Sequence, residues 1–106
     1  MKPENSALLI GVAWLACITA SQAQDTQVLR IRSLAATCGQ CHGTDGHAID
    51  AAAVPGLAGL PASYLIEQMG AFKSGARPAT VMHQIARGYN DAQINQLARY
   101  FAAQPK

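Results

Sequence analysis

The sequence predicts an all-α domain of about four helices, and three observations lead to that prediction. Apolar residues recur at helical spacing in four segments of the 106-residue chain. No alternating run of β-branched residues predicts a strand. Glycine and proline gather in residues 43–60, which predicts a long loop between the first two helices. A chain of this length has room for one domain.

The first two helices are bounded by capping and stop signals. The first is expected over residues 26–38, with Asp25 as its N-cap. Its inward face carries Val28, Ile31, Leu34 and Ala35. The second begins at Pro61, because proline favours the first position of a helix, and Gly75 stops it. Its inward face carries Leu65, Met69 and Phe72.

The last two helices are shorter and lie close together in the sequence. Thr80 opens the third helix and Gly88 ends it. The fourth follows a capping box that pairs Asn90 with Gln93, and Pro105 follows its end. Its buried face carries Ile94, Leu97, Ala98 and Phe101.

Residues 1–23 have the anatomy of a secretory signal. A weakly basic start at Lys2 precedes an apolar run from Ala7 to Ala20, which is shorter than the ~20 residues that a membrane-spanning helix needs. The small residues of Ser21-Gln22-Ala23 predict cleavage at the end of that segment. We therefore expect an exported, periplasmic domain over residues 24–106, with no membrane insertion after cleavage.

Two alternatives to cleavage stay open. Cys17 could carry a lipid anchor, although the bulky Trp14 lies where a small aliphatic residue is expected. The apolar segment could also remain attached as an uncleaved membrane anchor.

Charge and size restrict the functions that the domain can have. The formal net charge of +2 is too small to indicate nucleic-acid binding. Domains as small as residues 24–106 have a marginal core and usually need further stabilisation, such as a disulfide or a bound group. Cys38 and Cys41, the cysteines that remain after cleavage, are too close in sequence for a disulfide framework. A bound cofactor is therefore the natural candidate.

Cys38-Gly39-Gln40-Cys41-His42 is the Cys-x-x-Cys-His signature of c-type heme attachment. The spacing puts both sulfurs on one side of a helical turn, where each can form a thioether with a heme vinyl group. His42 can then bind the iron through a ring nitrogen. A redox dithiol would lie near a βαβ unit, and His47 and His83 do not give a recognisable zinc spacing. The sequence therefore predicts one covalently bound heme c.

Four side chains could supply the second axial ligand. Met82 is favoured, because enough chain separates it from His42 to pass around the heme. Met69 shares the apolar face of the second helix, where methionine usually fills a core. His47 is too close to His42 to reach the opposite heme face, and His83 stays open as an alternative. With His42 and Met82 as metal ligands, we expect a positive reduction potential.

Two further residues are expected at the heme. A ligating histidine needs its other ring N–H held, and the backbone carbonyl of Pro55 is the expected acceptor. A rigid turn at Pro55 is the alternative. Lys73, Arg77 and Arg87 flank the Met82 segment, and we expect Arg77 to pair with a heme propionate. Ordinary solvated surface charge is the alternative for these cations.

Several stretches resemble class I cytochrome c domains. Thr37 to Gly46 is similar to the heme-binding start of that class, and Pro55 to Gly59 resembles the proline-bearing loop of diheme and short bacterial cytochromes. The segment 71–82, continued by 85–91, resembles the cytochrome subunits of flavocytochrome c sulfide dehydrogenases. The resemblance implies the class I cytochrome c fold and an axial role for Met82. A single Cys-x-x-Cys-His motif makes this a monoheme version, whereas several relatives carry two heme domains.

The resemblance also implies a partner, a periplasmic FAD-containing subunit that oxidises sulfide and passes electrons to the heme. We therefore expect an electron-transfer protein with no catalytic residues of its own. A free soluble shuttle to a terminal oxidase or to another periplasmic redox protein is the alternative. A heme sensor with an open axial site is a further one, whereas a peroxidase would need an iron that Met82 does not block.

Overall fold

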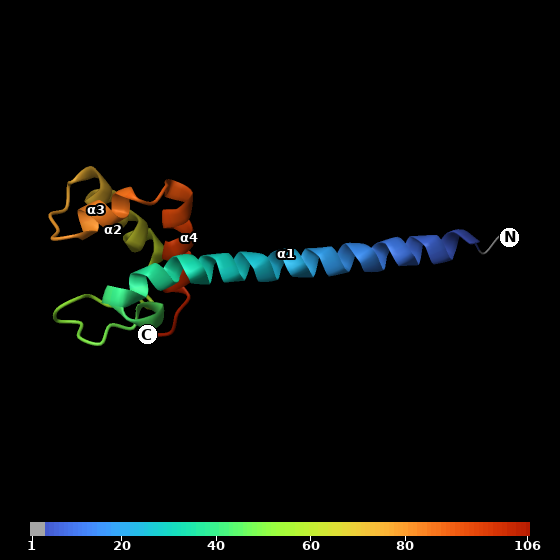
Figure 1. Cartoon of the computed structure of the whole chain (residues 1–106), viewed down its shortest axis with the longest axis horizontal. Coiled ribbons are helices and arrows are strands. Elements are labelled where there is room, and N and C mark those ends of the chain that lie inside the picture. Colours follow the sequence, from blue (N-terminus) through green and yellow to red (C-terminus); the bar gives the residue numbers. More distant parts are fainter. Residues whose placement is uncertain (1–3) are drawn as a thin grey trace. The chain divides into compact units, whose positions relative to one another are not determined.

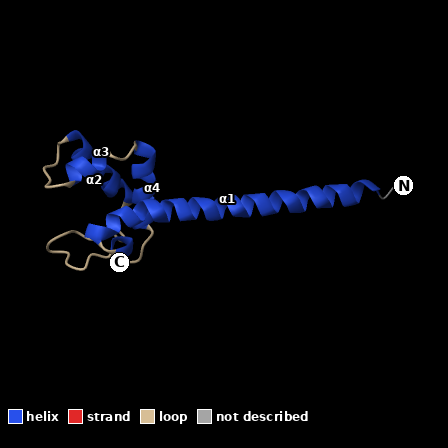
Figure 2. Ribbon diagram, in the orientation of Figure 1, coloured by secondary structure: helices blue, strands red, loops and turns tan. Residues whose placement is uncertain are grey.

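The computed structural model describes the backbone of residues 4–106 and the side chains of residues 22–106. The chain divides into two compact units, one up to Arg30 and the other from Ile31 to Lys106. The elements, in chain order, are α1 (Glu4–His42), the 3₁₀ turn η1 (Thr44–Gly46), α2 (Ala62–Ser74), α3 (Met82–Arg87) and α4 (Asp91–Ala102). Figures 1 and 2 show these helices, and no strand occurs among the described residues. The all-α prediction is therefore confirmed.

Helix α1 begins much earlier than the sequence predicted, and the assignment of Asp25 as its N-cap is wrong. Asp25 lies inside the helix, well after Glu4. The physical reason is that no glycine or proline interrupts the chain between Gly11 and Gly39, so nothing in the sequence breaks the helical hydrogen bonding. Val28, expected on the inward face, is 47% exposed, whereas Ala35 is buried.

The signal-sequence prediction for residues 1–23 stays a prediction. Lys2 lies outside the described residues, as do the side chains of Trp14 and Cys17. Within the part of the chain that the structure describes, no helix has both the length and the apolar character that a bilayer span requires.

The core of the second unit is small. One cluster joins Ala35 of α1, Leu65 of α2 and three residues of α4, namely Leu97, Ala98 and Phe101. Helix α2 packs against both α3 and α4. The buried face predicted for α4 is confirmed in full, since Ile94 is buried as well. No large side chain among the described residues is fully buried, so these helices enclose little apolar volume by themselves.

The helix ends agree with the sequence where a side chain or a glycine sets them. The Asn90 side chain accepts from the backbone N–H of Gln93, and the Gln93 side chain accepts from the backbone N–H of Asn90, each at 2.9 Å. Gly75 ends α2 with a left-handed φ of 83°, a conformation that favours glycine. Gly88 follows α3 as predicted.

The predicted starts of α2 and α3 are wrong by one or two residues. Pro61 is the N-cap of α2 and not its first residue, because its ψ of 134° is extended. Helix α3 begins at Met82 and not at Thr80, since the first carbonyl to accept helical hydrogen bonds is that of Val81. Met82 therefore lies where a loop becomes a helix.

The predicted loop between α1 and α2 folds back on its own beginning. The carbonyl oxygen of Gly46 accepts hydrogen bonds from the N–H groups of Leu57 and Ala58, at 2.8 and 3.2 Å. Gly43 has φ 81°, and a Cβ there would lie 1.9 Å from the carbonyl oxygen of His47, so this turn requires glycine. The loop carries Pro55 back to the end of α1, where it meets His42. In Figure 1, α2 and α3 lie on the other side of that end.

Candidate functional site

The second unit contains a largely apolar cavity of about 450 Å³. Its walls come from the end of α1, from the loop before α2, and from α2, α3 and α4. This volume lies in the range of small-molecule and cofactor sites. The lining residues whose side chains carry metal-binding, reactive or hydrogen-bonding groups are Thr37, Cys38, Cys41, His42, Tyr64, Gln68, Met69, Arg77, Thr80, Met82 and Tyr89.

Cys38 and Cys41 lie in the last turns of α1, and neither forms a disulfide. Residues three apart on a helix share one face, so both thiols border the same cavity. Burial raises the pKa of the Cys38 thiol, and the Thr37 hydroxyl beside it only partly offsets that shift. Two free thiols one turn apart can each form a bond to one rigid molecule in the cavity.

His42 is the last residue of α1 and is only 9% exposed. Its Nδ1 lies 2.7 Å from the carbonyl oxygen of Pro55. Because a carbonyl can only accept, Nδ1 carries the proton of the neutral ring, and the lone pair on Nε2 is free. A hydrogen bond of this kind holds the orientation of a metal-binding imidazole. The structure thus brings together two residues that the sequence analysis had placed at one site.

Two methionines line the cavity. Met82 is the first residue of α3, and Met69 lies in the middle of α2; both are half-buried. Met69 was expected to fill the core, but its side chain is absent from the buried core cluster and borders the cavity. The positions of the two methionines therefore leave both thioethers as candidates for the second iron ligand.

The two alternative histidines do not line the cavity. The ring nitrogens of His47 lie 3.2 Å from the carbonyl oxygen of Thr44 and 2.8 Å from that of Pro105, within the loop and the C-terminal segment. His83 lies on α3, and its buried Nδ1 has no hydrogen-bond partner among the side chains and backbone that the structure describes. Neither imidazole faces the thiols and His42 across the cavity.

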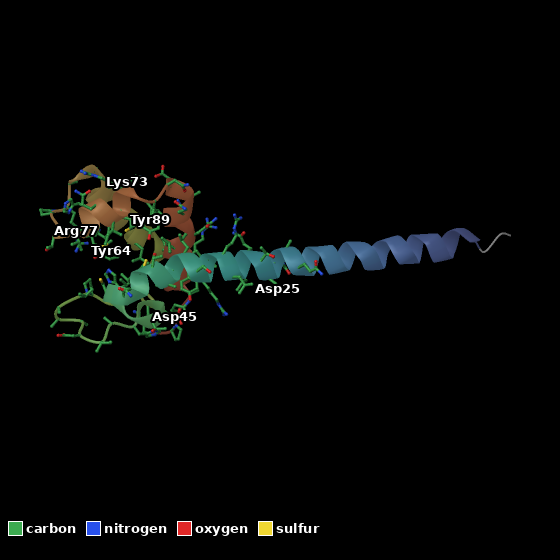
Figure 3. The ribbon with its side chains drawn as sticks, viewed as in Figure 1. Asp25, Asp45, Tyr64, Lys73, Arg77 and Tyr89 are labelled. Carbon is green, nitrogen blue, oxygen red and sulfur yellow. The ribbon has the colours of Figure 1, made fainter. Side chains whose placement is uncertain are left out.

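Of the three cations that flank Met82, only Arg77 lines the cavity. Its guanidinium group lies 4.7 Å from the centre of the Phe72 ring, and Nη1 donates to Oε1 of Gln68. Lys73 is engaged elsewhere, because its Nζ donates to the carbonyl oxygen of Tyr89 at 2.7 Å. Figure 3 labels Arg77, Lys73 and Tyr89 around the α2–α3 part of the domain.

The cytochrome c family model matches residues 30–104. The chain belongs to the cytochrome c family. This family carries covalently bound heme c, and Cys38 and Cys41 fit its attachment motif. Electron transfer is the function that the family implies. The resemblance to class I cytochromes c noted in the sequence is thereby confirmed.

Related proteins fall among bacterial electron carriers. A thiosulfate dehydrogenase electron acceptor from Stutzerimonas stutzeri is 36% identical over 101 residues, which are 92% of this chain and 47% of that protein. The cytochrome subunit of sulfide dehydrogenase from Chlorobaculum tepidum is 37% identical over 68 residues, or 64% of this chain and 60% of the relative. Cytochrome c-554(548) from Halomonas halodenitrificans is 38% identical over 71 residues, which are 84% of that protein. The chain spans roughly half the length of the first two.

The cavity of this cytochrome fits heme c. It supplies two unpaired thiols on one helical face, an imidazole whose Nδ1 is already held, two thioethers and a mainly apolar wall. Among the described residues, no three His, Cys, Asp or Glu side chains gather as they would around a bare metal ion. When bound, heme supplies a reversible one-electron change at its iron.

Several residues that line the cavity of this cytochrome were not among the site residues predicted from the sequence. Thr37 and Tyr89 border it and share a hydrogen bond of 2.8 Å, although 52 residues separate them. No spacing rule connects residues so far apart. Tyr64, Val81 and Ile85 also line the cavity and are 43%, 53% and 42% exposed. What marks these three residues as part of the site is that each is partly exposed at the cavity wall, which is visible only in the folded structure.

Proposed function

We propose that this cytochrome is a periplasmic electron carrier with one heme, held by Cys38 and Cys41 and ligated by His42 and Met82. The hydrogen bond from His42 Nδ1 to the Pro55 carbonyl carries the proposal. It leaves Nε2 available beside two free thiols, at a cavity that Met82 also lines. In the heme-bound protein, the carbonyl of Pro55 would hold the orientation of the imidazole.

Met82 is preferred to Met69 as the second axial ligand for a structural reason. Met82 follows the loop after Gly75, so its backbone can adjust to a metal bond. Met69 lies one turn after the buried Leu65, within a helix that packs against two others. The position of Met69 is thus already set by packing.

Arg77 is proposed to bind a heme propionate. Its guanidinium group borders the cavity and, among the described residues, bonds only one side-chain oxygen, the neutral amide oxygen of Gln68. A carboxylate is a stronger acceptor than an amide for an arginine. The bond to Gln68 would then be exchanged for one to the propionate, while the Phe72 ring supports the guanidinium plane.

We propose that the electron donor is an enzyme that oxidises a reduced sulfur compound. The sequence resemblance favours the FAD-containing subunit of a sulfide dehydrogenase, and one relative is the cytochrome subunit of such an enzyme. A thiosulfate dehydrogenase is the second candidate, because an electron acceptor of that enzyme aligns with 92% of this chain. The apolar run and small residues before residue 24 support export to the periplasm.

The axial ligands can be tested by absorption spectroscopy of the oxidised holoprotein. An iron–thioether bond gives a weak far-red band, which we expect in the wild type and in Met69→Leu but not in Met82→Leu. Leucine keeps nearly the same volume and removes the sulfur, so the pair is matched. A band that survives in Met82→Leu and vanishes in Met69→Leu would reject the assignment.

The partner can be tested by affinity purification from the periplasm. Recovery of a flavoprotein, followed by heme reduction on adding sulfide, supports the sulfide dehydrogenase. Reduction by thiosulfate dehydrogenase and thiosulfate, with no flavoprotein recovered, supports the second donor. If neither enzyme reduces the heme, the proposed donors are wrong and the free soluble shuttle is favoured.

A further inference from the structure

Thr37 and Tyr89 form a long-range hydrogen bond that the proposed heme ligation does not use. Thr37 immediately precedes Cys38 on α1, and Tyr89 lies in the short connection between α3 and α4. The two hydroxyl oxygens lie 2.8 Å apart. Both side chains line the cavity, so the bond lies next to the cofactor site and not on a remote surface.

The direction of this hydrogen bond follows from the contact between Thr37 and the backbone of Leu34. Its Oγ1 lies 2.7 Å from the carbonyl oxygen of Leu34, which can only accept. The single hydroxyl hydrogen of Thr37 therefore points to Leu34. Tyr89 must be the donor, and Thr37 the acceptor, in the bond between them. The phenol hydroxyl is thus the group whose removal breaks the link.

Tyr89 is also fixed on the side away from α1. Its backbone carbonyl accepts from Lys73 Nζ of α2 at 2.7 Å, and its N–H bonds to the Ala86 carbonyl of α3 at 3.3 Å. Lys73 lies 3.5 Å from the carboxylate of Asp91, the first residue of α4. Figure 3 labels Lys73 and Tyr89 in this part of the domain. Helices α2 and α3 therefore hold the backbone of the residue whose side chain bonds α1.

We propose that Tyr89 is a positioning residue for the heme, because its hydrogen bond to Thr37 fixes the attachment turn of α1 relative to α3. His42 follows Thr37 on the same helix, and Tyr89 follows the short helix that Met82 begins. A bond between Thr37 and Tyr89 therefore restrains the segments that carry the two axial ligands. The inference rests on the proposed function, since it needs Met82 to bind the iron.

A second tyrosine supplies a matched control. Tyr100 donates to Oδ1 of Asp45, and this bond spans 55 residues, much as the Thr37–Tyr89 bond spans 52. Tyr100 and Asp45 do not line the cavity. Replacing either tyrosine with phenylalanine removes one hydroxyl and one long-range hydrogen bond. Only the change at Tyr89 should affect the iron.

The test is a titration of the oxidised holoprotein with imidazole, which competes with the Met82 sulfur for the iron. Loss of one hydrogen bond corresponds to roughly a three- to tenfold change in an equilibrium constant. We expect Tyr89→Phe to bind imidazole three- to tenfold more tightly than the wild type. Its reduction potential should fall, because a weaker thioether bond favours the ferrous iron less. Tyr100→Phe should match the wild type in both measurements.

Changes at Thr37 test the same link from its other end. Thr37→Ser keeps an acceptor oxygen and should retain the wild-type imidazole affinity. Thr37→Val should behave like Tyr89→Phe, and the double variant should show no further change, because both remove one bond. Additive effects in the double variant would overturn the inference.

Failure of the inference can be distinguished from failure of the proposed ligation. If the far-red band depends on Met82 and Tyr89→Phe binds imidazole no more tightly than Tyr100→Phe, Tyr89 does not position the ligands. If the band does not depend on Met82, the proposed ligation fails, and the inference fails with it.

Discussion

Helices α3 and α4 lie next to the same cavity, but they are stabilised in different ways. Helix α4 buries four apolar residues, Ile94, Leu97, Ala98 and Phe101, and begins with a complete capping box. Helix α3 has six residues, buries only Ala86 and has no side-chain cap. Val81 and Ile85, at its start and within it, are 53% and 42% exposed at the cavity wall. These four residues of α4 also line the cavity, but each is at most 5% exposed, so the chain buries them without the heme. Val81 and Ile85, in contrast, border space that the heme is expected to fill.

We expect loss of heme attachment to have the largest effect on the difference in stability between α3 and α4. In a Cys38→Ala, Cys41→Ala double variant we expect α3 and the loop before it to lose most of their protection against amide hydrogen exchange. Helix α4 should keep more of its protection, because its core contacts come from Leu65, Ala35 and its own residues. Helical circular dichroism should fall as well. Equal protection of the two helices in the heme-free chain would contradict the comparison.

A smaller effect is expected from the cap of α4. Asn90→Ala removes the acceptor for the Gln93 N–H and should lower the free energy of unfolding by about 1 kcal/mol. Asn95→Ala is the matched control, because Asn95 lies within α4, where alanine is favoured, and only bonds the carbonyl of Asp91. Urea unfolding of the holoproteins measures both. The far-red band should be unchanged in each variant. Its loss in Asn90→Ala would show that the start of α4 affects the iron ligands, contrary to our expectation.

The smallest effect concerns the alkaline limit of stability. The hydrogen bond to Asp45 is the main cause that raises the pKa of Tyr100 above its usual value. A raised pKa favours the neutral phenol in the folded state, so this contribution is present below the ordinary tyrosine pKa of about 10. It is lost as the pH rises through the higher folded value.

Urea midpoints measured from pH 8 to pH 11 on the wild type and Tyr100→Phe would check this dependence. We expect the wild type to lose slightly more stability than Tyr100→Phe at the alkaline end. Asp45→Asn should show the same pH dependence as Tyr100→Phe. Asparagine tolerates the left-handed backbone conformation of position 45, where φ is 54°. A steeper alkaline loss in Tyr100→Phe than in the wild type would contradict the assignment.

Sequence patterns predicted local features well and helix α1 poorly. The face of α4, its capping box and the glycine stop of α2 each depend on a few neighbouring residues, and all three were confirmed. The start of α1 was wrong because Asp25 favours a helix start, while the residues around it continue the helix. Met69 was placed in the core because periodicity identifies an inward face, but not whether that face meets protein or a cavity.

The sequence by itself determined the cofactor, because Cys38, Cys41 and His42 lie within adjacent turns of one helix and need no distant residue to be recognised. The sequence also led us to expect the carbonyl of Pro55 at His42, 13 residues away. Only the tertiary structure revealed the bond between the hydroxyls of Tyr89 and Thr37, which lie 52 residues apart. Such contacts depend on the path of the loops and the packing of helices from separate segments. No local spacing encodes that path, so only the folded chain decides what surrounds the heme.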